Sequence, residues 1–517
     1  MHLSPILLVT VAHLGLYAHI GWANIKSDES SRYGDLSKLQ SFSWKPRIFI
    51  LSDILNEPDD SMSLVRYLLY SNEFDTRGIC ATTSWWLQNE THPEEMRRII
   101  NAYGEVVENL NRHVNSPSAS YQSAEDLLSL VTSGPSIYGK AALKEPLSDG
   151  AKRIILSLKG SEEPLFIAGW GGLNTLAQAL IHISKTMSAS EAATLRSRIR
   201  LYTISDQDDT GPWIRARYPD VFYIVSIHAW NEYQAATWPG IGLVGCPCTN
   251  STVVQNPWLD ENIRLGPLGA MYPQVVYTME GDTPSFLWLV QNGLGYRDRI
   301  NWGTWGGRYD RPQAGIDLGD GIDTNHFVNT LENVIGIDGQ SYSTSQASIW
   351  RWRAAYQDDF AARMQWTLTS NFKEVGHPPV LNINGQQGPD PVTIRVEANA
   401  TYIFDAGLTY DPDSEDNGRL EYQWTVYPEP TMFPTDLLDI KMEALEPPPG
   451  STGVITVNDA GFANVTLGTK IRVTVPEPAR NPSTGLPTDF HILLQVTNNA
   501  GKYPIRRYMR VVCEYDS

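Results

Sequence analysis

The sequence is poor in basic residues and in cysteine. Its 517 residues contain 40 Lys and Arg against 58 Asp and Glu, a formal net charge of −18. Such a negative balance argues against the basic face that nucleic acids and anionic membranes require, so neither is an expected partner. Four cysteines are too few for a disulfide scaffold. Cys246 and Cys248 have no second pair nearby to complete a zinc site, so they bridge locally or to another cysteine.

Long apolar runs are also missing. No segment after residue 23 approaches the roughly 18 uninterrupted apolar residues of a membrane-spanning helix. Residues 6–22 form a shorter apolar run that ends in small residues, as a signal peptide cleaved after Ala23 does. A membrane anchor is the alternative, but His and Gly residues interrupt the run. We therefore expect residues 1–23 to be a signal peptide and the protein to be secreted, extracellular and soluble. Glycosylation is expected at four sequons, which begin at Asn89, Asn250, Asn399 and Asn464.

Apolar and aromatic residues are plentiful. Hydrophobic residues make up 42% of the chain and charged residues 19%, which is enough apolar material for a large core and excludes a disordered chain. The length suggests two or three domains. The 16 Trp and 24 Tyr exceed what a core needs, so we expect some of these rings to line a ligand surface.

Two different sequence patterns follow one another along the chain, after a polar N-terminal segment. Residues 24–45 are polar and Ser-rich, which predicts a flexible leader. In residues 46–376 short apolar runs alternate with helical patterns, which indicates an α/β domain with a mainly parallel sheet flanked by helices. In residues 377–517 short alternating runs are separated by turns, which indicates an all-β sandwich. The predicted strands are 47–51, 77–82, 164–168, 199–204, 221–227, 392–396, 401–404, 420–426, 472–475, 491–496 and 508–512, and the predicted helices 61–70, 94–112 and 173–184.

An acidic loop follows the first predicted strand. It carries Asp53, Glu57, Asp59 and Asp60, and the last two fall in the first turn of the next helix. Ligands of open α/β sheets bind outside the carboxyl ends of the strands, so these groups converge where a site is expected. Calcium prefers such sets of oxygen ligands. A solvated acidic loop that caps a helix is an equally good interpretation of these residues alone.

This loop resembles the N-terminal aspartate cluster of the nucleoside hydrolases, in which a strand ends in Asp-x-Asp and a helix opens with Asp-Asp. Without a gap, Asp53 matches the first Asp, and Asp59 and Asp60 match the final pair. The middle Asp of that family, a calcium ligand and presumed base, falls on Leu55. A gapped alignment assigns its role to Asp53, and Glu57 is a possible substitute.

Three later segments also resemble nucleoside hydrolases. Residues 166–177 are similar to the strand and loop that open a helix in that family, and residues 229–233 to its sugar-binding Asn region. Residues 280–286 contain Asp282, which would complete the metal site. The resemblance implies that Asn174, Asn231 and Glu232 bind the sugar.

The residues of these motifs resemble even more closely those of one related family, the cellulose-binding proteins with a nucleoside-hydrolase-like domain. That family carries a C-terminal immunoglobulin-like domain, and the resemblance covers about residues 46–517. It implies a glycosidase-type hydrolase that uses calcium. The segments that carry it are 56–60, 204–209, 230–233, 281–286 and 302–308.

We therefore expect a secreted hydrolase that cleaves an O- or N-glycosyl bond in a carbohydrate or glycoside. By resemblance, calcium is held by Asp60 with Asp53 and Asp282. Asp53 is also the best remaining base, and Asp59 is a second base candidate or binds a sugar hydroxyl. Four tryptophans are expected to stack on the sugar, namely Trp170, Trp230, Trp302 and Trp305. The glycines of 302–307 predict that Trp302 and Trp305 are exposed.

Two other functions fit the same sequence. One is a carbohydrate-binding or cellulose-binding protein that has lost catalysis, which Leu55 favours. The other is a nucleoside hydrolase proper, which the added β-domain and the Trp-rich loops make less attractive. A second acidic loop, Asp206–Asp209, also follows a predicted strand, and it either contacts substrate or only ends that strand.

Overall fold

The computed structural model describes residues 34–312, 324–414, 417–430, 440–478 and 489–515. The predicted signal peptide and the first part of the predicted leader lie outside these residues. In the described part, no helix combines the length and apolar character needed to cross a membrane.

A large sheet of eight strands forms the N-terminal part, in the order β3-β2-β1-β4-β5-β6-β8-β7. All neighbours are parallel except β7 and β8, which are antiparallel. The predicted mainly parallel α/β sheet is thus confirmed. Its strands are β1 (Arg47–Ser52), β2 (Asp75–Ala81), β3 (Val131–Ser133), β4 (Leu165–Gly169), β5 (Ile199–Thr203), β6 (Phe222–Val225), β7 (Tyr309–Asp310) and β8 (His326–Asn329).

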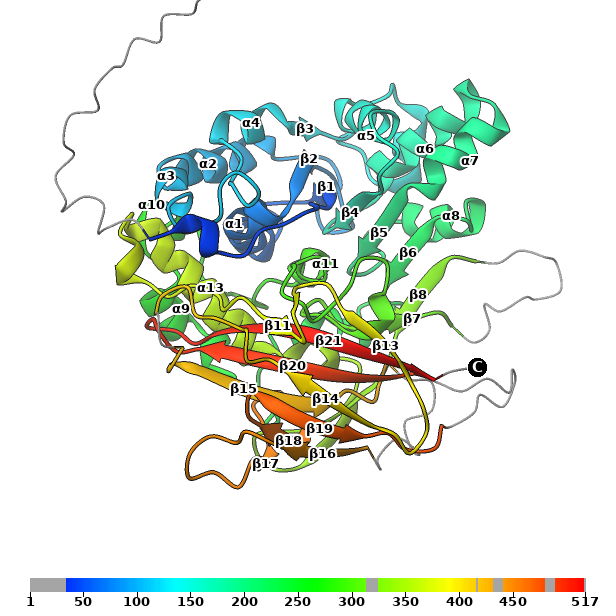
Figure 1. The fold of residues 1–517 in the computed structure, drawn as a ribbon. Coiled ribbons are helices and arrows are strands. Elements are labelled where there is room, and N and C mark those ends of the chain that lie inside the picture. Colours follow the sequence, from blue (N-terminus) through cyan, green and yellow to red (C-terminus); the bar gives the residue numbers. More distant parts are fainter. Residues whose placement is uncertain (1–33, 313–323, 415–416, 431–439, 479–488, 516–517) are drawn as a thin grey trace, which may run out of the picture.

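Helices cover both faces of this sheet (Figure 1). In β1 the side chains of Ile48 and Ile50 join one core cluster, and those of Phe49 and Leu51 join the other. A strand buried on both faces reads as a continuous apolar run, which is why β1 is recognisable in the sequence. The first face is covered by α1 (Asp59–Tyr70), α2 (Pro93–Gly104) and α13 (Arg353–Leu368), and the second by α5 (Asp149–Lys159), α6 (Asn174–Thr186), α7 (Ala189–Ser197) and α8 (Thr210–Arg217).

The single helix predicted over 94–112 is wrong. Helix α2 ends at Gly104, a residue with low helix propensity, and α3 (Val107–Leu110) is a separate turn. The apolar periodicity continues through the break because Val106 and Leu110 belong to the same core. The other short elements are α4 (Ala124–Ser129), α9 (Asn256–Asn262), α10 (Gly266–Gly269), α11 (Pro284–Leu287), α12 (Ala347–Trp350), β9 (Glu332–Ile335), β10 (Ser341–Thr344), β11 (Asn382–Ile383) and β12 (Gln386–Gln387).

Two larger sheets and the short pair β11-β12 make up the C-terminal part, which confirms the predicted all-β region. One has the order β13-β21-β20-β15-β18-β17 and the other β14-β19-β16, and only β13 and β21 run parallel. Trp424 and Phe404 lie in the core of this part. The strands are β13 (Val392–Val396), β14 (Thr401–Asp405), β15 (Leu420–Val426), β16 (Lys441–Ala444), β17 (Val454–Val457), β18 (Ala463–Leu467), β19 (Lys470–Thr474), β20 (Phe490–Asn498) and β21 (Ile505–Tyr515).

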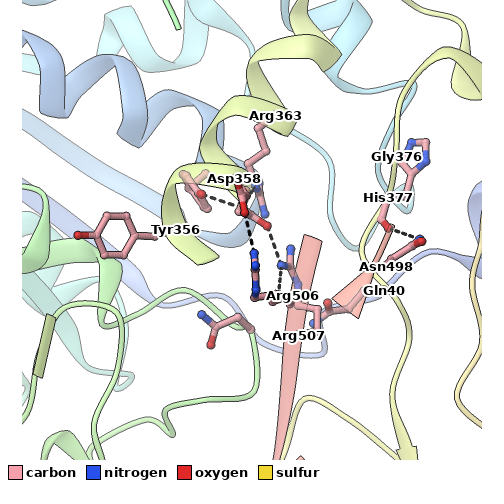
Figure 2. Close-up of polar contacts among 12 residues, drawn as sticks. Gln40, Tyr356, Asp358, Arg363, Gly376, His377, Asn498, Arg506 and Arg507 are labelled. Carbon is pink, nitrogen blue, oxygen red and sulfur yellow. Dashed lines mark hydrogen bonds and ion pairs between the residues drawn. The ribbon is translucent and has the colours of Figure 1, made fainter. Parts of the chain in front are cut away.

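The two parts are joined by buried contacts between α13 and β21. Arg506 pairs with Asp358 at 2.7 Å, as Figure 2 shows. Arg507 pairs with Asp359 at 2.7 Å. Asp359 also pairs with Arg363 of its own helix at 3.0 Å. One apolar cluster continues across this contact. A second cluster lies wholly within residues 381–515, so the C-terminal part also has a core of its own, and the boundary near 377 stays a prediction.

The structure places the cysteines and the sequon asparagines. Cys246 and Cys248 form a local disulfide, the first of the two expected alternatives, whereas Cys80 and Cys513 are free and buried. Burial raises the pKa of the Cys80 thiol to about 12, so it is inert at neutral pH. The four sequon asparagines are all exposed, as glycan attachment requires; glycosylation itself stays a prediction.

Candidate functional site

An acidic cavity of about 320 Å³ lies at the carboxyl end of β1. The strand ends at Ser52, and the loop that follows leads into α1, whose first two residues are Asp59 and Asp60. The cavity has the position that ligands take in parallel α/β sheets and a volume typical of small ligand sites. Its lining consists of Asp53, Asn56, Glu57, Asp59, Asp60, Trp86, Ile204, Gln207, Asn231, Tyr233, Trp238, Tyr277, Thr278 and Asp282.

Three of its carboxylates form a tight cluster. Asp59, Asp60 and Asp282 each offer an oxygen atom within 4.8 Å of the others. Burial raises their pKa values, and repulsion by neighbouring carboxylates raises them further, to about 7 for Asp59 and well above the usual range for the other two. Oδ2 of Asp282 is buried without a hydrogen-bond partner. An orphaned oxygen among crowded carboxylates is a donor set that fits a hard divalent cation such as calcium.

Two neighbours fix the positions of these carboxylates. The Ser52 hydroxyl donates a hydrogen bond to Asp60 at 2.5 Å, which ties α1 to the end of β1. Gly281 lies so close to Asp59 that a Cβ there would meet Oδ2 at 2.8 Å. A larger residue at 281 would therefore displace the Asp59 carboxylate or the Trp238 ring.

A buried ion pair holds the loop of Asp282 against α1. Arg66 of α1 donates to Glu280 at 2.5 Å, and Glu280 also accepts from the Tyr272 hydroxyl at 2.6 Å and the Thr283 hydroxyl at 2.8 Å. Glu280 itself has a φ of 52°, in the left-handed region. Sequence reasoning missed both partners of the ion pair, since Arg66 and Glu280 are 214 residues apart.

Asp53 lines the same cavity but lies outside the cluster of three. Burial raises its pKa to about 6, against the lowering effect of a hydrogen bond with Ser84. Its predicted part in the metal site stays a prediction, because the close set contains Asp59 in its place. A buried carboxylate with a pKa near 6 matches what a general base at neutral pH needs.

Leu55, which aligns with the middle Asp of the nucleoside hydrolase motif, lies outside the cavity. It has a φ of 75°, is 50% exposed, and is not part of the lining. The loop between Asp53 and Glu57 therefore turns its middle residue to solvent.

The predicted sugar-binding residues are divided. Asn231, with a φ of 58°, lines the cavity, whereas Glu232 is exposed outside the lining. Asn174 is fully buried at the start of α6, where its amide donates to Thr83 and to the carbonyl of Ile137, both at 2.8 Å. Its polar atoms are thus used by the protein itself.

The expected exposure of Trp305 is wrong, because this residue is fully buried. The glycines beside it serve close packing, since a Cβ at Gly306 would meet the carbonyl oxygen of Pro284 at 2.3 Å. Trp302 is half-buried and lies edge-on to His491 of β20, at 5.0 Å between ring centroids, outside the cavity lining. Trp170 is also buried, and its indole N–H donates to Ser285 at 2.8 Å. None of these three rings offers a free face to the acidic cavity.

Other aromatic residues take the place expected for them. Trp86, Tyr233, Trp238 and Tyr277 line the cavity. Trp86 lies in the loop after β2, which ends at Ala81, so its place beyond the carboxyl end of a predicted strand was the signal that could have found it.

The second acidic loop has a structural role. Asp206 forms a two-pronged pair with Arg215, with both distances at 2.7 Å. Asp208 accepts from the backbone of Thr210 at 2.8 Å and of Asn174 at 3.1 Å. Asp206 and Asp208 are thus used by the protein itself, whereas Gln207 between them lines the cavity, so contact of this loop with substrate stays a prediction.

Comparison with known proteins gives matches to two family descriptions. Residues 47–309 match the nucleoside hydrolase-like domain of cellulose-binding Sde182, and residues 401–515 match the C-terminal domain of cellulose-binding protein Sde0182. No curated protein matches the chain.

Among solved structures, the chain is similar to a nucleoside hydrolase-related hypothetical protein from Saccharophagus degradans that is associated with carbohydrate metabolism. The identity is 27%, the TM-score is 0.70, and the match covers 92% of this chain and 100% of that one. An engineered protein superposes with a TM-score of 0.14 at 11% identity, covering 90% of this chain and 93% of its own. An endo-beta-1,4-mannanase from Thermotoga petrophila gives 0.15 at 9% identity, covering 92% and 99%. These two carry no argument about the fold.

Proposed function

Because the chain belongs to the Sde182 family of cellulose-binding proteins with a nucleoside hydrolase-like domain, we propose that it is a secreted glycosidase-type hydrolase. Its substrate is a carbohydrate or glycoside, in which it cleaves an O- or N-glycosyl bond. The family description and the carbohydrate-metabolism association of the Saccharophagus protein support the class of ligand. Neither nucleic acid nor a membrane is part of the proposal.

The observation that carries the proposal is the cluster of Asp59, Asp60 and Asp282 with its unpartnered oxygen. A protein that only binds sugar has no evident need to bury three mutually repelling carboxylates at one point. Burying charges without partners is costly, so such a cluster persists where a cation compensates it.

These three side chains would hold a calcium ion. When bound, the ion would supply positive charge that orients sugar hydroxyls and lowers the pKa of a water molecule. Asp53, at the edge of the same cavity, would accept the proton of the attacking water, a contribution of about 10²–10⁴-fold. Asn231 and Gln207, which line the cavity, would hydrogen-bond the sugar. Trp238 and Tyr233 would limit the access of bulk water.

A hydrolysis screen tests this function. The wild type, Asp60→Ala and Asp53→Asn are assayed on aryl glycosides, oligosaccharides and nucleosides, with EDTA or calcium. We expect turnover by the wild type with calcium, and its loss in both variants and with EDTA. Thermal unfolding of each variant controls for folding. No turnover of any substrate by the calcium-loaded wild type would contradict the proposal.

The second candidate is a non-catalytic carbohydrate-binding protein on the same scaffold. The observation that favours it is Leu55, which stands where the nucleoside hydrolase motif has its middle Asp and is directed to solvent. Saturable glycan binding that survives EDTA, without turnover, would decide for this candidate.

A further inference from the structure

We propose that Trp85, Trp86 and Trp230 form an aromatic platform at the mouth of the acidic cavity that binds a run of neutral sugar units. The inference rests on the proposed function and specifies its substrate as an oligosaccharide or polysaccharide chain. We refer to these three residues as the aromatic platform.

The exposure of the three rings is the first observation. Trp85 is 41% exposed, Trp86 45% and Trp230 61%. In the part of the chain that the structure describes, every other tryptophan is buried or half-buried. A cluster of large exposed apolar side chains marks a binding surface rather than chance.

The rings also support one another. The centroids of Trp85 and Trp230 are 4.6 Å apart at an angle of 69°, and those of Trp86 and Trp230 are 6.1 Å apart at 25°. Trp85 further contacts Tyr138 edge-on at 5.8 Å. Rings held in place before binding lose little conformational entropy when a ligand docks, so they are efficient anchors.

The backbone below the rings is equally constrained. The N–H of Ser84 donates to the carbonyl of Leu87 at 2.9 Å, and its hydroxyl accepts from the N–H of Trp86 at 3.1 Å. The N–H of Trp85 donates to the carbonyl of Gln207 at 2.7 Å. The short turn after β2 is thereby fixed to the loop after β5.

The platform is continuous with the acidic cavity. The indole N–H of Trp86 donates to the Tyr233 hydroxyl at 3.2 Å, and both residues line the cavity. A chain that stacks on Trp86 and Trp230 therefore leads directly to Asp53 and the carboxylate cluster.

The chemistry of the rim favours a neutral saccharide. Trp offers a broad apolar face for the C–H face of a sugar ring and an N–H for its hydroxyls. Glu57 lines the cavity and the exposed Glu232 is two residues from Trp230, so the local field is negative. A chain of uronic acids would be repelled by these carboxylates.

The test measures binding of cellohexaose by isothermal titration calorimetry to the full chain and to Trp86→Ala and Trp230→Ala. We expect each substitution to raise Kd about tenfold or more, the effect of losing one ring contact of about 1.4 kcal/mol. Trp213→Ala, a half-buried tryptophan on α8, is the matched control and should bind like the wild type. Circular dichroism confirms that each variant is folded.

A second probe is a hexamer of galacturonic acid, for which we expect no binding. Unchanged cellohexaose affinity in both platform variants, or equal binding of the acidic hexamer, would overturn the inference. So would a wild type that binds no cellohexaose but whose sedimentation changes when the platform is mutated, because the rings would then contact protein.

The inference and the proposed function fail in different ways. Calcium-dependent hydrolysis of a short aryl glycoside, combined with platform variants that bind cellohexaose like the wild type, would remove the inference alone. Loss of cellohexaose binding in the platform variants, in a protein without turnover, would support the platform and contradict the hydrolase.

Discussion

The Arg66 guanidinium and the Glu280 carboxylate form a fully buried ion pair, with 2.5 Å between Nε and Oε2. Arg66 belongs to the helix that begins with Asp59 and Asp60, and Glu280 lies two residues before Asp282. The pair thus sets the distance between the two chain segments that form the carboxylate cluster. Arg66 is a positioning residue, because it touches neither the cavity nor a ligand of it.

Replacing Arg66 by Met should destabilise the protein by about 3–5 kcal/mol, because Glu280 is left as a buried charge without its partner. Urea unfolding measures this loss. The double variant Arg66→Met with Glu280→Gln removes both charges and should recover part of the stability. A loss that is the same in the single and the double variant would show that the ion pair is not its cause.

Asp60→Asn should stabilise the protein in EDTA and abolish its stabilisation by calcium. The folded pKa of Asp60 lies above its unfolded value, so this carboxyl costs stability as pH rises through the unfolded pKa and beyond. The amide removes that cost at pH 7. In the wild type, calcium at 100 times Kd should add about 2.7 kcal/mol. Thermal scans with EDTA and with calcium measure both effects, and an unchanged calcium response in the variant contradicts the assignment.

Acid should weaken the contact between α13 and β21 through Asp359. Burial alone would raise its pKa, but Arg507 and Arg363 outweigh this and lower it to about 2. The pairing therefore contributes fully above the unfolded pKa of about 3.9 and is lost as pH falls toward 2. The contribution is about 2–3 kcal/mol. Unfolding free energies from pH 7 to pH 3 should fall more steeply in the wild type than in Asp359→Asn, and equal slopes would refute this.

Leu55→Asn should raise stability by about 0.5–1 kcal/mol. A leucine at a φ of 75° is strained, whereas Asn tolerates the left-handed region, and the exposed side chain loses little packing. Leu408→Asn is the control, since Leu408 is similarly exposed and is not among the residues with positive φ. Chemical unfolding compares the two, and an equal effect at both positions would exclude backbone strain as the cause.

The parallel sheet and the acidic loop could be predicted because both leave local signals. A strand buried on both faces, such as β1, is a continuous apolar run, and Asp59 and Asp60 follow it at helix-start positions. The surroundings of Trp305 could not be predicted, because glycines permit close packing as well as loops. The pairing of Arg66 with Glu280 joins segments 214 residues apart and leaves no periodic trace in the sequence.

The loops at the carboxyl edge of the sheet hold aromatic residues as well as carboxylates. Trp85 and Trp86 lie in the loop after β2, four and five residues beyond Ala81, so the rule that located the carboxylates after β1 also covers these rings. Asn174 obeys that rule as well and is nevertheless consumed by internal hydrogen bonds. A position at the carboxyl edge of the sheet therefore identifies candidate site residues, and the burial of each side chain shows which of them a ligand can reach.

Calcium titration by isothermal calorimetry tests the central assignment most directly. The EDTA-stripped wild type is compared with Asp282→Asn at the same pH and ionic strength. The carboxylate cluster predicts that the wild type binds one calcium ion per chain more than the variant does. Equal calcium stoichiometry and affinity in the two proteins would contradict it.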